Sequence, residues 1–179
     1  GVVVKKLRLV NDKELLLSRL EEMITSHTKL FSFSHVTNKS GIRLPAKEID
    51  EIAHQRGILV VYDGAQSAGQ FPVNLREIDC DFYNVTSYKW LLGPYGEGVF
   101  YLKRELLPQV EVTWLGSYST KWLDFERDEY ELWDTARRYE FGARSIPLRI
   151  AFGKAVDFIA KVGPDRIAER VAELASYFK

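Results

Sequence analysis

The sequence predicts an α/β domain built on a largely parallel sheet. Segments typical of strands alternate with segments typical of helices, and no internal repeat interrupts the alternation. One run, Ile58 to Tyr62, is apolar throughout, which is typical of a parallel-sheet strand covered on both faces. With 179 residues, 46% of them hydrophobic, the chain can bury a core as one domain, or as one domain and part of another.

The expected elements follow one another in a regular order. Strands are predicted over Val2 to Val10, Leu30 to Val36, Ile58 to Tyr62, Phe82 to Val85 and Val99 to Leu102. Helices are predicted from Asn11 or Asp12 to about Ser26, from Pro45 to Gly57, from Ile146 to Val162 and from Pro164 onward. Asn11 or Asp12 can cap the first helix, and Pro45 suits the first turn of the second. Residues 108–140 are aromatic-rich and receive no assignment.

Composition excludes several classes of protein. Lys and Arg total 25, as do Asp and Glu, so the basic excess typical of a nucleic-acid-binding protein is missing. The apolar runs are far shorter than the ~20 residues of a membrane span. A single cysteine, Cys80, allows no internal disulfide and is expected to be a small buried residue; with three scattered histidines it predicts no metal site. We therefore expect a cytoplasmic protein with no nucleic-acid or membrane partner.

The two ends of the chain differ from those of most domains. Residue 1 is a glycine that leads at once into the strand-like Val2 to Val4, and the chain stops within a helical pattern at Lys179. Natural domain boundaries are usually polar, with Gly or Pro nearby. The sequence is therefore expected to be a segment of a longer protein, or an unusually trimmed member of its family.

Polar residues follow three of the predicted strands at the point where each strand ends. These residues are Asn38, then Asp63 with Gln66, then Thr86 with Lys89. Ligands of open α/β sheets bind beyond the carboxyl ends of the strands. A carboxylate directly after an apolar strand is expected to be partly desolvated, and a lysine in an apolar pocket becomes a usable nucleophile or base. An acid and a lysine on neighbouring strand ends suit a protonated pyridine ring that is bonded to the lysine.

These strand ends also carry a resemblance to a known family. The matching strings are Ser34 to Gly41, Asp63 to Gln66, Thr86 to Leu91 with Gly93-Pro94, and, more weakly, Tyr139 to Gly142. At these strings the sequence resembles the class V aminotransferase family, which includes cysteine desulfurases and isopenicillin N epimerase-like proteins. The resemblance implies the large domain of a fold type I transferase that depends on pyridoxal 5'-phosphate (PLP), a mainly parallel sheet flanked by helices. It further implies an amino acid substrate and a homodimer, with aminotransferase, epimerase and desulfurase or lyase reactions all left open.

The resemblance implies a role for each matching residue. Lys89 would form a Schiff base with the cofactor and later carry the proton at the α-carbon of the substrate. Asp63 would pair with the pyridine nitrogen and keep the ring an electron sink. Gln66 and Asn38 would hydrogen-bond the phenolic oxygen of the ring. Thr86, three residues before the lysine, would bind the phosphate.

Two positions depart from the family pattern. Tyr88 stands where the family often has a histidine, just before the lysine, and its hydroxyl would have to reach the phosphate instead. Ala143 stands where a threonine usually follows the glycine that matches Gly142. The contact of that threonine with a neighbouring subunit's phosphate would be lost unless Arg144 or Ser145 replaces it. The family's amino-terminal phosphate loop and carboxyl-terminal small domain are expected to lie outside residues 1–179, so this segment alone is not expected to be a competent catalyst.

The candidate residues also have purely structural interpretations. Asp63 could cap a turn, Lys89 could be an ordinary surface lysine, and Asn38 could be a turn residue. The corresponding alternative function is a non-catalytic interaction module that keeps the fold without the cofactor. Ala143 favours this alternative. Asp63, Gln66 and Lys89 oppose it, because a fold freed from the cofactor has little physical reason to keep an acid and a lysine in an apolar setting.

Overall fold

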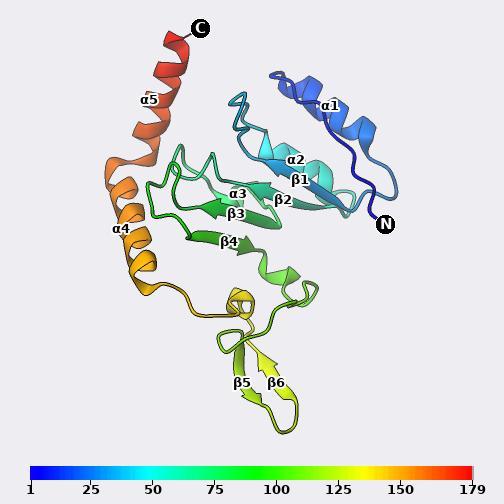
Figure 1. Ribbon diagram of the computed structural model, residues 1–179. Coiled ribbons are helices and arrows are strands. Elements are labelled where there is room, and N and C mark those ends of the chain that lie inside the picture. The colour runs from blue at the N-terminus through cyan, green and yellow to red at the C-terminus, as the bar shows by residue number, and fades with distance from the viewer. Residues whose placement is uncertain (179) are drawn as a thin grey trace.

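A computed structural model describes residues 1–178, which form a four-stranded sheet, a separate two-stranded sheet and the helices around them (Figure 1). The strands are β1 (Leu30–Ser34), β2 (Leu59–Asp63), β3 (Phe82–Thr86), β4 (Gly98–Leu102), β5 (Thr120–Asp124) and β6 (Glu129–Leu132). The α-helices are α1 (Lys13–Met23), α2 (Ala46–His54), α3 (Leu75–Ile78), α4 (Ile146–Val162) and α5 (Pro164–Tyr177). Two short 3-10 helices cover Arg104–Leu106 and Ala136–Tyr139.

The larger sheet is mainly parallel, as the sequence predicts. Its order is β1-β2-β3-β4, in which β1, β2 and β3 run parallel and β4 runs antiparallel to β3. Asp63, the last residue of β2, lies opposite Ser34 on β1 and Asn84 on β3. The carboxyl ends of the three parallel strands therefore meet at one edge of the sheet, and the loops that carry the candidate residues begin there.

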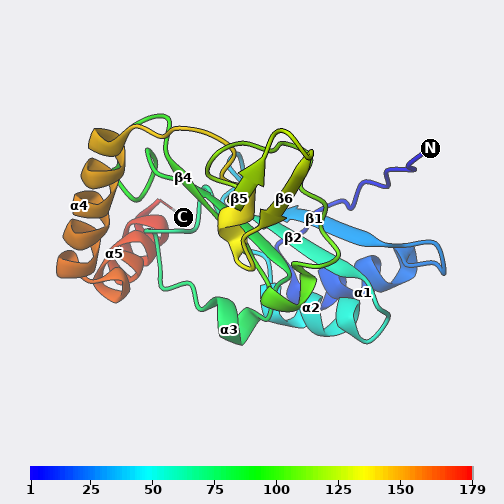
Figure 2. The same cartoon turned by 90° about the horizontal axis from the view of Figure 1, so that it is seen from below.

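The main core lies on one face of this sheet, and a smaller cluster of Leu102, Leu106 and Leu107 packs against Leu59 and Phe82 on the other face. Along β2 the side chains alternate, so that Val60 and Tyr62 are 0% exposed whereas Val61 is half-buried and Asp63 is exposed. Helices α1, α2 and α3 all lie on the buried face, and α4 and α5 stand beyond the end of the sheet (Figure 2). The second face of the strand at residues 58–62, predicted to be covered as well, is covered in part: within residues 1–178 Leu59 and Val61 are half-buried there.

Helix ends follow the local sequence signals. Asp12, rather than Asn11, caps α1, because its carboxylate accepts the backbone N–H of Leu15 at 2.8 Å. The helix ends at Met23, three residues earlier than predicted. Pro45 lies at the start of α2, and Gly163 with a φ of 95° separates α4 from α5. Across residues 1–178, no helix is both long and apolar enough to span a membrane.

The predicted strand over residues 2–10 is wrong. The segment has no regular secondary structure, and Val2, Val3 and Val4 are 93%, 85% and 78% exposed. A strand requires a hydrogen-bonded neighbour, and this segment pairs with none of the described strands. Only its later apolar residues, Leu7 and Leu9 among them, pack against the core.

Candidate cofactor site

The end of β2 is a tight turn that presents Asp63. The side chain of Asp63 accepts the backbone N–H of Ala65 at 2.9 Å, while the Asp63 carbonyl accepts the backbone N–H of His35 at 2.9 Å. Gly64 donates its own N–H to the carbonyl of Asn84 at 2.7 Å. Backbone hydrogen bonds to both neighbouring strands thus hold the turn. Asp63 itself is exposed, so the predicted desolvation of its carboxylate is wrong: by the alternation along β2 its side chain lies on the face opposite to the buried Tyr62.

Gln66, at the end of the same turn, is oriented by a tryptophan. Its side-chain oxygen accepts the indole N–H of Trp90 at 3.1 Å. An indole can only donate a hydrogen bond, so the carbonyl side of the Gln66 amide must face Trp90. The NH₂ group of Gln66 is then left as a donor for a ligand. This contact joins the loop after β2 to the loop after β3.

A second turn follows β3 and carries Lys89. Thr86, the last residue of β3, is half-buried and lies opposite Gly98 on β4. Ser87 is 0% exposed, and its carbonyl accepts the N–H of Gly93 at 2.8 Å, which closes the loop between them. The Lys89 carbonyl accepts the N–H of Leu92 at 3.0 Å.

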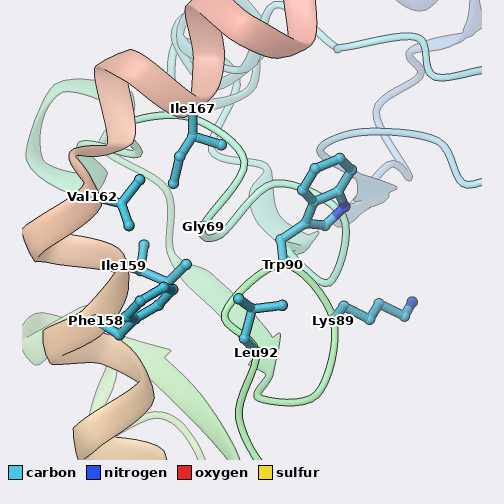
Figure 3. Close-up of a pocket in the computed structure, with 8 residues that line it drawn as sticks. All are labelled: Gly69, Lys89, Trp90, Leu92, Phe158, Ile159, Val162 and Ile167. Atoms are coloured by element: carbon cyan, nitrogen blue, oxygen red, sulfur yellow. The ribbon is translucent and has the colours of Figure 1, made fainter.

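The stem of Lys89 lines an apolar cleft of about 490 Å³, but its ammonium group does not enter it. The cleft is lined by Gly69, Lys89, Trp90 and Leu92 and by Phe158, Ile159, Val162 and Ile167 of α4 and α5. Figure 3 shows the Lys89 side chain extending away from the α4 residues. Within residues 1–178 the ammonium group forms no ion pair. The predicted apolar surroundings therefore apply to the stem and not to the charged end.

The remaining two candidates lie at the surface. Asn38 is exposed in the loop after β1, where Thr37 organises the backbone by accepting the N–H of Ile42 at 2.9 Å. Tyr88 is 41% exposed, and its ring stacks on that of Tyr95 with centroids 4.4 Å apart. The structure thus joins Gln66 to the loop of Lys89 through Trp90, whereas the side chains of Asn38 and Tyr88 are exposed at the surface.

Sequence reasoning missed the contacts that support these turns. It assigned no partner to the Gln66 amide, which accepts the indole N–H of Trp90. It also assigned no partner to the His35 ring, whose Nδ1 lies 2.8 Å from the Tyr83 hydroxyl on β3. Both contacts join residues more than twenty positions apart in the sequence, so no local sequence pattern predicts them.

The fold and its strand ends indicate a class of protein, and comparison with known proteins identifies the family. A mainly parallel α/β sheet with an acid, an amide and a lysine on adjoining strand ends is typical of α/β proteins that bind ligands beyond the carboxyl ends of their strands. The family model "Aminotransferase class-V" matches residues 1–179, and the chain belongs to that family.

Two curated relatives and one solved structure illustrate the similarity. A probable cysteine desulfurase of Halalkalibacterium halodurans is 32% identical over 99% of this chain, and an isopenicillin N epimerase of Amycolatopsis lactamdurans is also 32% identical over 99%. The chain spans less than half of their lengths, 43% and 46%. The apo structure of a cysteine desulfurase from Thermococcus onnurineus superposes with a TM-score of 0.82 and 29% identity, over 90% of this chain and 40% of that one. The resemblance to both subgroups and the predicted fold class are confirmed.

Proposed function

We propose that this chain is the cofactor-holding part of a PLP-dependent enzyme that acts on an amino acid, with Lys89 as the residue that bonds the cofactor. The observation that carries the proposal is the set of groups left available at one edge of the sheet. Asp63 offers an exposed carboxylate, Gln66 offers an oriented NH₂ group, and Lys89 offers an amine that has no ion-pair partner within residues 1–178.

These groups fit the charges of the cofactor. Asp63 would hold the proton of the pyridine nitrogen, since a carboxylate with a single backbone donor still has lone pairs free. Gln66 would donate to the phenolic oxygen, with Asn38 as a second donor. PLP, when bound, supplies an electron sink for charge that develops at the α-carbon of an amino acid.

The loop after β3 would bind the phosphate of the cofactor and would act on the α-carbon of the substrate. The Thr86 hydroxyl, and that of Tyr88, would bind the phosphate oxygens. Lys89 would hold the cofactor at its carbonyl carbon and would take and return the proton at the α-carbon of the substrate. Residues 1–179 would thus form part of a PLP-binding large domain. A homodimer would be the working assembly, and the substrate would be an amino acid such as those of desulfurases and epimerases.

A titration with PLP tests the proposal. We expect the chain to develop a visible absorption band that saturates with added PLP. Lys89→Arg should abolish it, because a guanidinium keeps the charge but does not form a Schiff base. Lys39→Arg, on the exposed loop after β1, is the matched control and should leave the band intact. Equal bands in all three proteins would refute the role of Lys89, and the lack of a saturating band in the wild-type chain would favour a scaffold that keeps the fold without the cofactor.

Trp90 provides a finer test of the same site. Trp90→Phe keeps an aromatic ring but removes the indole N–H, so the Gln66 amide is free to rotate. We expect PLP affinity to fall about threefold to tenfold, the size of one neutral hydrogen bond. Trp122→Phe is the control, because the Trp122 indole also donates to a side chain, Glu131 at 2.9 Å, on the β5–β6 hairpin. A Trp90 variant with unchanged affinity would show that the contact does not orient Gln66.

A further inference from the structure

Three buried polar side chains form a hydrogen-bonded chain behind the turn at the end of β2. The Tyr83 hydroxyl lies 2.8 Å from Nδ1 of His35 and 2.5 Å from Oγ of Ser67. Ser67 Oγ in turn donates to the carbonyl of Gly64 at 3.1 Å. His35 and Tyr83 are each 2% exposed and Ser67 is 0% exposed, so solvent does not compete for these groups.

The last acceptor fixes the direction of every hydrogen bond in the chain. The Gly64 carbonyl can only accept, so the single proton of the Ser67 hydroxyl is committed to it. The Ser67 oxygen must then accept the hydrogen bond from the Tyr83 hydroxyl. Tyr83 therefore has no proton left to donate to His35. The Tyr83 oxygen is left as the acceptor for His35, and Nδ1 of His35 must therefore carry a proton.

His35 is suited to this role as a neutral ring. Burial, and to a smaller extent the nearby charge of Arg43, lowers the pKa of His35 to about 4. At neutral pH the imidazole therefore has one proton, and the hydrogen-bond direction assigns it to Nδ1 and leaves Nε2 without one.

The hydrogen-bonded chain of side chains ends at the turn after β2, which backbone hydrogen bonds also hold. His35 donates its backbone N–H to the carbonyl of Asp63, one residue before the carbonyl that accepts Ser67 Oγ. The ring of Tyr83 lies so close behind Gly64 that a Cβ there would be 2.0 Å from it. His35, which follows β1, and Tyr83 of β3 thus hold the turn between them, on the face opposite to the Asp63 carboxylate.

We propose that Tyr83, Ser67 and His35 are positioning residues that set the orientation of the turn presenting Asp63 and Gln66. The inference rests on the proposed function for its consequence, and it deepens that function by assigning a supporting role to three residues buried behind the turn. They act from the helix-covered face of the sheet, so they are not catalytic residues.

Tyr83→Phe removes the hydroxyl that joins the three residues and keeps the ring. In this variant we expect PLP affinity to fall about threefold to tenfold and amide hydrogen exchange to accelerate at Gly64, Ala65 and Ser67. Tyr139→Phe is the matched control, because it also removes a tyrosine hydroxyl that donates to a carbonyl, that of Val110 at 2.9 Å, away from the turn. It should change neither quantity.

Heteronuclear NMR of the His35 imidazole in the wild-type chain tests the direction of the hydrogen bonds without any cofactor. The expected signature is the neutral ring with Nδ1 protonated, and an Nε2-protonated ring would overturn the proposed chain.

The two proposals can fail separately. If the wild-type chain binds PLP and Tyr83→Phe binds it equally well, the positioning role is overturned while the proposed function stands. If the wild-type chain binds no PLP, the proposed function fails, and hydrogen exchange decides the positioning role. Faster exchange at the turn in Tyr83→Phe than in Tyr139→Phe would support that role, and equal exchange would overturn it.

Discussion

Gly64→Ala is expected to destabilise the chain by roughly 3–5 kcal/mol, a large part of the about 5–15 kcal/mol that typically separates folded from unfolded domains. The added Cβ would lie 2.0 Å from Cε1 and 2.8 Å from the hydroxyl of Tyr83. That ring is 2% exposed and is hydrogen-bonded to both His35 and Ser67, so it cannot move aside without breaking buried hydrogen bonds. Denaturant unfolding followed by circular dichroism measures the loss.

Gly153→Ala is the control for this substitution. Gly153 lies within α4, and a Cβ there would meet nothing within 4 Å. Alanine is the better helix former by about 1 kcal/mol, so this change should be neutral or stabilising. The combination of Gly64→Ala with Tyr83→Ala should cost less than the sum of the single changes, because the clash disappears with the ring. A Gly64→Ala protein as stable as Gly153→Ala would contradict the packing described for the turn.

Asp50→Asn is expected to remove a strong pH dependence of stability. Asp50 on α2 is 1% exposed; one carboxylate oxygen accepts the Tyr62 hydroxyl at 2.8 Å, and the other has no partner within residues 1–178. Burial raises the pKa of Asp50 from 3.8 to about 7, with smaller raising contributions from Asp81 and Asp79, against the opposing effects of Tyr62 and His54.

The sign of the pH effect follows from the protons bound in each state. Above the unfolded pKa the unfolded chain releases the Asp50 proton, while the folded chain keeps it until the pH reaches the folded value. The wild-type chain should therefore lose roughly 3–4 kcal/mol relative to Asp50→Asn between about pH 4 and about pH 8, with little further change above. Urea unfolding of both proteins across this range measures the difference.

Glu51→Gln provides the comparison for Asp50, since Glu51 is exposed on the same helix. Its stability should follow the wild-type curve at every pH. Parallel curves for the wild type and Asp50→Asn would mean that Asp50 titrates as it does in the unfolded chain, in contradiction to its burial.

Local signals predicted most of the helices and strands. Pro164 and Gly163 separate α4 from α5 as predicted, because a proline suits the first turn of a helix and a glycine readily adopts a positive φ. Local signals failed where pairing with a strand distant in the sequence determines whether a segment forms a strand. Val2 to Val10 has a strand-like composition but no partner strand among the described residues. The short helix α3 and the hairpin of β5 and β6 were not predicted; in that hairpin exposed side chains such as those of Trp122 and Tyr130 leave no regular burial pattern.

The residues of the candidate site could be predicted from the sequence, but their surroundings could not. Asp63, Gln66 and Lys89 could be identified because each follows a strand in a recognisable string, and the structure places their loops at one edge of the sheet. Their surroundings could not be predicted. The exposure of Asp63 depends on which face the helices cover, and the orientation of Gln66 depends on Trp90, 24 residues away.

The central claim, that Lys89 bonds PLP, is tested most directly by trapping. The purified chain is mixed with PLP, reduced with borohydride and digested, and the modified peptide is located by mass spectrometry. A single modification at Lys89 that is missing in Lys89→Ala is the predicted result, and it would establish the cofactor site. Modification scattered over exposed lysines such as Lys39, and unchanged in the mutant, would contradict the account and leave a chain that keeps the fold without a working site.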